Sequence, residues 1–169
     1  MQIQLEGRAR RFGDDINTDY IIQSTRKRDS LDPQVLKQYL LETIDPSFAG
    51  SVQPGDLLVA GRNFGCGSAM EVAATVVVGA GIKAVLAMSF ARTYYRNAIN
   101  NGLVPVECDT GDIHEGNQLS VLLTDQEVAV ENRATGRRIA GRRLPEIVLQ
   151  ILAHGGLVPY FRRYKDFAF

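Results

Sequence analysis

LLVAGRNFGCGSAMEVAATVVVGAGIKAVLAMSFARTYYRNAINNGLVPVE, residues 57–107, contains three short apolar runs separated by two longer segments. Apolar runs of this length, bounded by glycine and polar residues, are typical of buried strands. The runs are residues 57–61, 84–88 and 103–107. The intervening segments predict helices at 71–78 and at 89–102, which ends at Gly102. Because strands and helices alternate, we predict right-handed βαβ units and a parallel sheet.

The flanking segments predict mainly strands. Residues 3–12 are predicted to form a first strand. Beyond residue 119, LSVLLTD and EVAVEN alternate like a hairpin, and TGRRIAG adds another turn and strand. An amphipathic helix is predicted at 144–153, before Gly155-Gly156. The predicted fold class is therefore α/β, a parallel βαβ core with β-rich flanks, in one domain over residues 1–169.

The region between the first strand and this core is less regular. Residues 19–22 are predicted as a short extended piece, and 23–30 as a polar and basic loop. Asp32-Pro33 resembles a helix start, so a helix is predicted over 33–42. Residues 53–56, QPGD, are predicted as a turn before the second strand.

Composition limits the classes of function. The 169 residues suffice for one domain with a hydrophobic core. Lys plus Arg and Asp plus Glu both total 19, so a nucleic-acid partner is not expected. No stretch approaches the 18 apolar residues of a membrane span, and the N-terminal segment lacks the apolar core of a signal peptide. A cytoplasmic protein with no membrane partner is expected.

The two cysteines, Cys66 and Cys108, lie far apart in the sequence and form no CxxC pair. Two such thiols cannot alone hold an iron–sulfur cluster or a structural zinc. We therefore predict no metal ligands in this chain. Lone thiols also fit a reducing compartment.

NFGCGSAMEVA is the most unusual segment, because it joins a buried strand to a buried helix through closely spaced glycines. Glycines such as Gly67 let the backbone approach a ligand, and a helix N-terminus favours an anion. Ser68 stands three residues before Glu71, which is the spacing of a helix-capping box. From these residues alone, Ser68 is either a helix cap or a catalytic group.

Two other segments leave alternatives open. GDDINTDYII, residues 13–22, is either a turn with local side-chain bonds or an acidic corner near an active site. Arg92 and Arg96 share one face of a predicted helix. They are either a carboxylate site or structural residues.

Taken together, these segments resemble the small subunits of the 3-isopropylmalate dehydratase family and its homoaconitase relatives. The resemblance runs in order through most of the chain. It rests on four blocks: FGDDINTDYII (12–22), DPSFAGSVQPGDLLVAGRNFGCGS (45–68), GAGIKAVLAMSFARTYYRNAINNGLVPVE (79–107) and LPEIVLQILAHGGLVPY (144–160). It implies the swivelling β/β/α domain of the aconitase superfamily.

The resemblance also implies an activity and a partner. A separate large subunit would carry a [4Fe–4S] cluster, whose iron acts as a Lewis acid on a hydroxy dicarboxylate. The reaction implied is the interconversion of 2- and 3-isopropylmalate in leucine biosynthesis, by removal and re-addition of water. Isolated from the large subunit, the chain is a candidate homo-oligomer.

The site residues implied by the resemblance begin with Ser68, whose alkoxide would take the proton from carbon. Asp19 falls on the active-site aspartate of the family. Arg26 or Arg28 would bind substrate from the loop that follows, and Gly67 would let the backbone approach it.

The sequence departs from the family at the site. The family reads Ser-Arg where this chain has Ala69-Met70, and the missing arginine binds a substrate carboxylate in the family. Met has no charge and cannot replace a bidentate guanidinium. The loop at 23–30 is unusually basic. Two explanations compete: a changed substrate with the positive charge moved to this loop, or loss of activity with the fold retained.

Three alternatives to the isopropylmalate reaction follow. The first is a related dehydratase for a methyl-substituted malate or a homocitrate-like acid. The second is a non-catalytic assembly or regulatory subunit. The third, RNA binding, is the least favoured because the charge is balanced.

Overall fold

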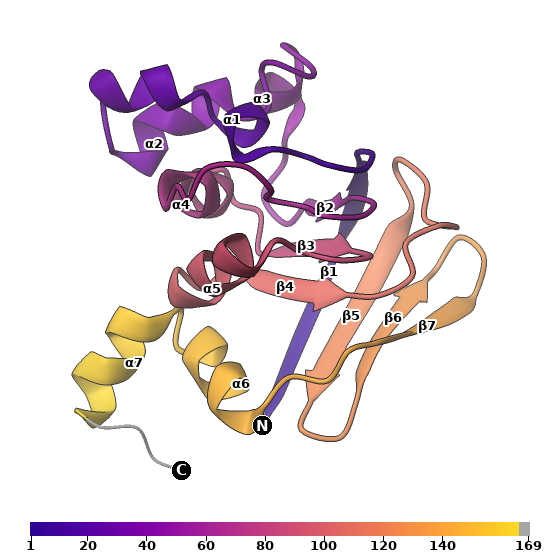
Figure 1. Ribbon diagram of the computed structural model, residues 1–169. Helices are drawn as coiled ribbons and strands as arrows, with labels where there is room; N and C mark the ends of the chain where they lie inside the picture. The colour runs from indigo at the N-terminus through magenta and orange to yellow at the C-terminus, as the bar shows by residue number, and fades with distance from the viewer. Residues whose placement is uncertain (166–169) are drawn as a thin grey trace.

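The computed structural model describes residues 1–165, which form a seven-stranded mixed sheet with helices packed beside it (Figure 1). The strand order is β4-β3-β2-β1-β5-β6-β7. The strands are β1 (Gln2–Arg11), β2 (Leu57–Val59), β3 (Ala84–Ala87), β4 (Val104–Glu107), β5 (Gln118–Thr124), β6 (Val128–Asn132) and β7 (Arg137–Gly141). The α/β class with a parallel core and β-rich flanks is confirmed.

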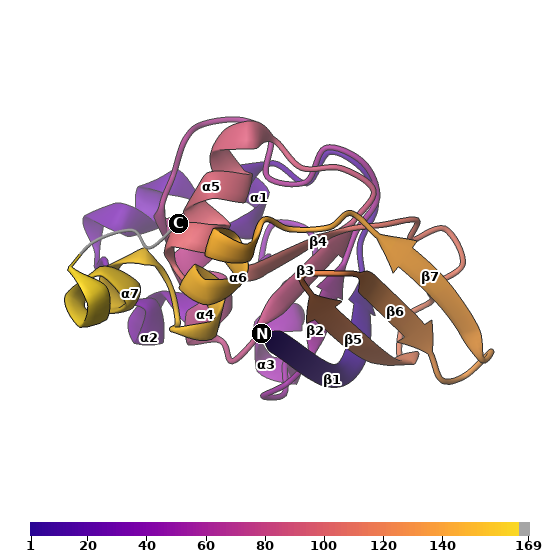
Figure 2. The ribbon, with the colours of Figure 1, turned by 90° about the horizontal axis from the view of Figure 1, so that it is seen from below.

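Strand β1 joins two different half-sheets. Residues 2–8 pair antiparallel with β5, whereas residues 9–11 pair parallel with β2. Strands β2, β3 and β4 continue the parallel half, and β5, β6 and β7 form an antiparallel meander. Seen from below, the meander lies at one end of the molecule and helices α2, α4 and α7 at the other (Figure 2).

The helices connect the parallel strands and cover the sheet. They are α1 (Thr18–Ile21), α2 (Pro33–Leu36), α3 (Phe48–Ser51), α4 (Val72–Gly79), α5 (Arg92–Asn100), α6 (Glu146–Ala153) and α7 (Leu157–Tyr164), with 3-10 turns η1 (Ser24–Arg28) and η2 (Lys37–Tyr39). Helix α4 connects β2 to β3 and α5 connects β3 to β4, as the alternation predicted. Helix α7 was not predicted.

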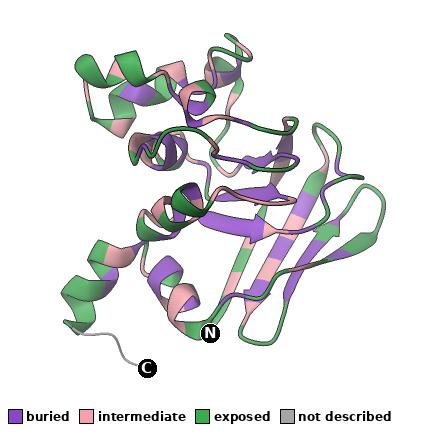
Figure 3. Ribbon diagram, in the orientation of Figure 1, coloured by how far each residue is buried: buried purple, intermediate pink, exposed green. Residues whose placement is uncertain are grey.

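Two hydrophobic clusters pack on opposite faces of the parallel strands. Leu57 and Val59 of β2 belong to the cluster that contains α6, and Leu58 belongs to the cluster that contains α1, α2 and α4. Successive strand residues point to opposite faces, so these short strands are buried on both sides. Figure 3 shows β2, β3 and β4 as almost entirely buried, while the exposed residues concentrate on α2, α7 and the loops of the meander.

Three local predictions before β2 were wrong. Residues 19–22 are not extended, because Asn17 accepts a hydrogen bond from the Asp19 N–H (2.9 Å) and caps helix α1. The loop at 23–30 contains the 3-10 turn η1. The helix predicted over 33–42 stops at Leu36, continues as η2, and ends where Leu41 adopts a positive φ of 57°.

Asp56 links the turn before β2 to β1 through two arginines on one face of the strand. Its carboxylate accepts hydrogen bonds from Arg8 (2.8 Å) and from Arg10 (3.2 Å), and Asp56 is only 3% exposed. Burial alone would raise the pKa of Asp56, but hydrogen bonds from Arg8, the Gln53 N–H and Arg10 outweigh it and lower that pKa below its usual value. Arg10 also reaches Glu115 (2.8 Å).

We predict that Asp56→Asn lowers the free energy of unfolding at neutral pH by about 1–3 kcal/mol, because the partly buried Arg8 loses its charged acceptor and the buried Arg10 loses one of two. A carboxyl with a lowered folded-state pKa stabilises the fold above its unfolded pKa of about 4, and that contribution is lost as the pH falls through the folded-state pKa. The difference between wild type and variant should therefore be full at pH 7 and shrink below about pH 4. Urea unfolding across this range measures it.

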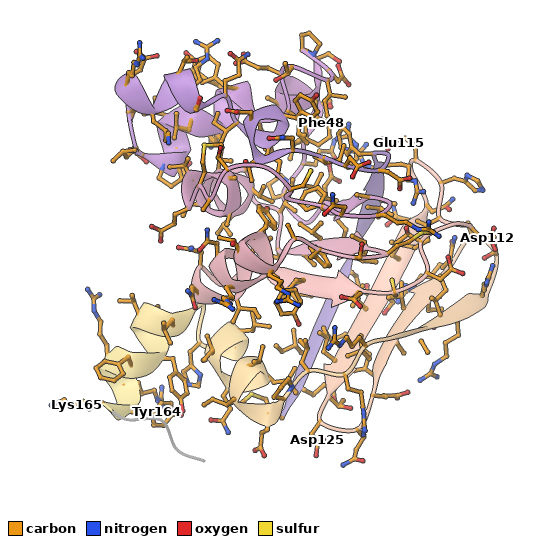
Figure 4. All side chains as sticks on the ribbon, viewed as in Figure 1. Phe48, Asp112, Glu115, Asp125, Tyr164 and Lys165 are labelled. Atoms are coloured by element: carbon orange, nitrogen blue, oxygen red, sulfur yellow. The ribbon has the colours of Figure 1, made fainter. Side chains whose placement is uncertain are left out.

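A matched control is Asp125→Asn. Asp125 is exposed in the turn between β5 and β6, at the opposite end of the sheet from Phe48 and Glu115 (Figure 4). The Asp125→Asn variant should differ from wild type by less than about 0.5 kcal/mol in its free energy of unfolding. Equal destabilisation of Asp56→Asn at neutral and acid pH would contradict the ion-pair explanation.

Candidate active site

Three loops meet where β1, β2 and β3 end. The carboxyl ends of neighbouring parallel strands share one edge of a sheet, which is where α/β proteins commonly bind ligands. Backbone hydrogen bonds join the loops: Gly65 N–H donates to Ile16 (2.8 Å) and Phe64 N–H donates to Ser89 (3.0 Å). The loop after β2 is therefore held between the loops after β1 and β3.

Two glycines allow this close approach. A Cβ at Gly65 would lie 2.1 Å from the Tyr94 ring, and a Cβ at Gly67 would lie 2.5 Å from the Asn17 side chain. Both residues also have positive φ, 81° and 92°. Only glycine fits both requirements, so any larger residue at either position would push the loop away from α5 or from Asn17. Gly67 was predicted to bring the backbone near a ligand, and the contact observed is with Asn17.

Thr18 fixes the position of the Ser68 main chain. Its N–H donates a hydrogen bond to the Cys66 carbonyl and its Oγ1 donates one to the Ser68 carbonyl, each 2.8 Å long. The Ser68 main chain is thus held by a residue from the GDDINTDYII segment. The two segments that the sequence singled out separately form one unit.

The capping-box interpretation of Ser68 is wrong. Helix α4 begins at Val72, its cap is Glu71, and the cap makes no side-chain hydrogen bond to the first turn. The bond from Thr18 draws the Ser68 main chain toward α1 instead of into the first turn of α4. The Ser68 hydroxyl is exposed and makes no hydrogen bond within residues 1–165. The remaining alternative from the sequence is a chemical role.

A small cavity of about 90 Å³ opens beside Ser68. It is lined on one side by the loop after β2 and on the other by the start of α5, with residues Ser68, Ala69, Met70, Arg92, Thr93 and Asn97. Met70 is 4% exposed and packs into the core, so it forms an apolar wall. Among residues 1–165, Arg92 is the only charged residue that lines the cavity.

Asp19 lies next to Thr18 but does not line this cavity. Its carboxylate accepts a hydrogen bond from the Ser24 N–H (2.9 Å), which ties η1 to α1. The other acids of this segment hold the neighbouring loop: Asp14 accepts from the Arg62 N–H (2.7 Å) and Asp15 from the Asn63 side chain (2.8 Å). The acidic segment 13–22 therefore makes long-range hydrogen bonds through Asp14 and Asp15, in addition to the local turn that Asn17 caps.

The two candidate arginines of the basic loop differ in their contacts. Arg26 pairs with both oxygens of Glu42 (3.0 and 3.1 Å) and lies over the Tyr39 ring at 3.8 Å. The hydrogen bond that Arg26 donates to Glu42 raises the pKa of Arg26. Arg28 is exposed, and no ion pair or hydrogen bond engages its side chain in the described part of the chain. Arg28 is therefore the freer of the two to meet a ligand.

The cysteines do not form a cluster site. Burial raises the pKa of the Cys66 thiol and raises the pKa of Cys108 to about 12. Metals bind the thiolate, which such pKa values disfavour. Within residues 1–165, no three His, Cys, Asp or Glu side chains gather as a metal-binding group. The donors of the described residues do not fit an iron–sulfur cluster.

Sequence reasoning paired Arg92 with Arg96 but could not separate their positions. Both line a larger cleft of about 570 Å³ with Glu107, Arg142 and Arg143, whereas Arg92 alone also reaches the cavity at Ser68. The helix predicted over 89–102 placed Arg92 inside the helix, so the sequence carried no signal that Arg92 begins it. The geometry adds that this helix start faces the loop after β2.

None of the helices within residues 1–165 is long and apolar enough to cross a membrane.

Comparisons with known proteins agree with this architecture. Residues 14–111, more than half of the chain, match the family described as "Aconitase C-terminal domain". The small subunit of the isopropylmalate/citramalate isomerase of Methanocaldococcus jannaschii is 42% identical over 165 residues, covering 96% of each chain. The methanogen homoaconitase small subunit of the same organism is 42% identical over 161 residues, covering 95% of this chain and 93% of its own.

A third relative and a solved structure agree. The 3-isopropylmalate dehydratase small subunit 1 of Methanopyrus kandleri is 43% identical over 171 residues, covering 100% of this chain and 99% of its own. The crystal structure of a 3-isopropylmalate dehydratase chain from Methanocaldococcus jannaschii superimposes with a TM-score of 0.88 at 41% identity, covering 96% of each chain. The chain therefore belongs to the aconitase C-terminal domain family, among the small subunits of the 3-isopropylmalate dehydratase type.

Proposed function

We propose that this protein is the small subunit of a hydro-lyase that isomerises a hydroxy dicarboxylate, with isopropylmalate as the substrate, and so acts in leucine biosynthesis. The observation that carries the proposal is the Ser68 hydroxyl. It is exposed, has no hydrogen-bond partner within residues 1–165, and lies on a loop that Thr18 holds in place. Similarity to dehydratase small subunits over nearly the full length supports the reaction class.

The proposed role of Ser68 is that of general base. As an alkoxide, its Oγ takes the proton from the carbon next to the one that carries the hydroxyl. The electron pair of the broken C–H bond forms the C=C bond while the hydroxyl leaves as water, with a proton taken from an acid outside this chain, in solvent or in the partner subunit. Water then adds back with its hydroxyl on the carbon that lost the proton, and its other proton returns to that acid. Ser68 gives its proton to the carbon that first carried the hydroxyl, which completes the isomerisation and restores the alkoxide.

The proposed partner is a large subunit that carries the [4Fe–4S] cluster. The names of the relatives, all small subunits, support a partner of this kind. The donors within residues 1–165 do not fit the cluster. The proposed contribution of this chain is the base, the backbone approach at Gly67 and the side chains that bind substrate. Asp19 is proposed to shape the site through η1, because its carboxylate holds the Ser24 N–H (2.9 Å).

A related substrate is the second candidate. Relatives named for isopropylmalate/citramalate and for homoaconitase match this chain at the same 42% identity. Ala69 and Met70 make the wall of the cavity apolar and uncharged. A methyl-substituted malate or a homocitrate-like acid is therefore the alternative to isopropylmalate, and turnover of a substrate panel by the assembled enzyme decides between them. An absence of all turnover would favour the non-catalytic assembly role.

We predict that the purified chain alone shows no iron–sulfur absorbance and no dehydratase activity, because its donors do not fit a cluster. Activity should appear when the large subunit is added. The measurements are the visible spectrum, the iron content per chain and turnover before and after mixing. Stoichiometric iron in the isolated chain would contradict the proposed division between the subunits.

We predict that Ser68→Ala, in the assembled enzyme, lowers kcat by about 10²–10⁴-fold, the usual effect of removing a positioned base. The free energy of unfolding should change by less than about 0.5 kcal/mol, since the hydroxyl is exposed and caps no helix. Ser24→Ala is the matched control, because Ser24 is also exposed and its hydroxyl makes no hydrogen bond in the described part of the chain. Normal turnover by Ser68→Ala would remove Ser68 from the mechanism.

We predict that Arg28→Ala reduces kcat/KM by at least about tenfold, because a buried substrate carboxylate needs a positive partner. Lys27→Ala is the control: in the 3-10 turn η1, successive residues point in different directions. Arg26→Ala would also remove the ion pair with Glu42 and the contact with the Tyr39 ring. The free energy of unfolding of this variant must therefore be measured together with its kinetics. Unchanged kcat/KM in all three variants would reject a role for this loop in binding.

A further inference from the structure

In the described part of the chain, the cavity beside Ser68 has a single charged residue in its lining. The residues of the loop after β2 contribute only a hydroxyl, glycine backbone and apolar side chains, and α5 contributes Thr93, Asn97 and Arg92. Arg92 forms no ion pair or hydrogen bond within residues 1–165, whereas Arg8, Arg10 and Arg26 are all paired with carboxylates. A guanidinium without a partner beside an exposed hydroxyl is ready to accept an anion.

We propose that Arg92 binds the substrate carboxylate that lies next to the carbon on which Ser68 acts. The proposal rests on the proposed function, since it takes the ligand to be a hydroxy dicarboxylate. Arg92 then supplies, from the start of α5, the positive charge that position 70 lacks in this chain. The loop residue Arg28 is left to meet the other carboxylate.

The position of Arg92 is well fixed. It is the first residue of α5, and the preceding residue, Ala91, donates its N–H to the Phe64 carbonyl (2.9 Å) in the loop after β2. Two residues further on from Arg92, Tyr94 packs inward: it is 1% exposed and its hydroxyl donates to the Ala73 carbonyl of α4 (3.1 Å). The start of α5 is thus tied to the same loop that carries Ser68. A side chain that begins on a backbone held by hydrogen bonds loses less conformational entropy when it binds a ligand.

The surroundings of Arg92 strengthen its attraction for an anion. Met70, which is 4% exposed, gives the cavity an apolar wall, and a charge–charge contact beside an apolar wall is screened less than one surrounded by water. On its other side, Arg92 borders a larger cleft, and within residues 1–165 Glu107 is the only acidic residue that lines it.

The test is made on the small subunit assembled with its large subunit and assayed with the best hydroxy dicarboxylate found. Arg92→Ala and Arg92→Gln should both reduce kcat/KM by about 10–100-fold, the range for loss of a hydrogen bond to a charged group. Arg92→Lys should keep part of the activity, because it retains the charge but loses the bidentate geometry. Arg96→Ala is the matched control, one turn along the same helix and outside the cavity, and should stay within about threefold.

Added guanidinium ion separates binding from a merely structural role. At millimolar concentrations it should restore part of the activity of Arg92→Ala and none of that of Arg92→Gln, whose side chain fills the space. Wild type and Arg96→Ala should not gain. Assembly with the large subunit and the melting temperature are measured for every variant.

The outcomes are distinguishable. If wild type turns over a dicarboxylate while Arg92→Ala and Arg92→Gln match it, the proposal for Arg92 is overturned and the proposed function stands. Lost activity without rescue by guanidinium, or failure of both variants to assemble, would make Arg92 a structural residue and also overturn the proposal. If the assembled wild type turns over no hydroxy dicarboxylate, the proposed function fails and the inference fails with it.

Discussion

The sharing of β1 between two half-sheets is the constraint on which the rest of the structure depends. Its first part pairs antiparallel with β5 and its last three residues pair parallel with β2. At the change of partner, Gly7 faces the turn before β2, where a Cβ would lie 1.9 Å from the Gly55 carbonyl oxygen. Only glycine lets the turn approach the strand so closely. This contact sets the position of β2, and through it the loop that carries Ser68.

The candidate site follows from that arrangement. Once β1 and β2 lie side by side, the segments that leave their ends must pass each other, and the hydrogen bonds from Thr18 to Cys66 and Ser68 join them. Gly65 and Gly67 make room for Tyr94 and Asn17. The result is a serine whose main chain is held by a hydrogen bond and whose hydroxyl makes no hydrogen bond within residues 1–165. A group that must change its protonation state during a reaction benefits from this combination, because its position is set without using its reactive atom.

Much of the architecture was predictable from local patterns. The strands and helices over residues 57–107 were found because both faces of the strands are buried, which gives continuous apolar runs. The meander was found from alternation of polar and apolar residues. Local patterns failed between residues 19 and 42, where very short helices carry no periodicity to detect and the Asn17 cap decides the conformation. The family was predictable too, since its segments recur in order.

The sequence by itself determined the alternation of strands and helices over residues 57–107, the hairpin that follows residue 119, and that Ser68 stands in an unusual glycine-bearing turn. Only the tertiary structure decided that Ser68 does not cap α4, that Arg26 is occupied by Glu42, and that Arg92 reaches the cavity while Arg96 does not. The physical reason is that pattern and propensity act between residues close in the chain. The partner of a side chain is set by segments far apart, here separated by 50 residues between Thr18 and Ser68. Their meeting depends on the packing of the whole sheet.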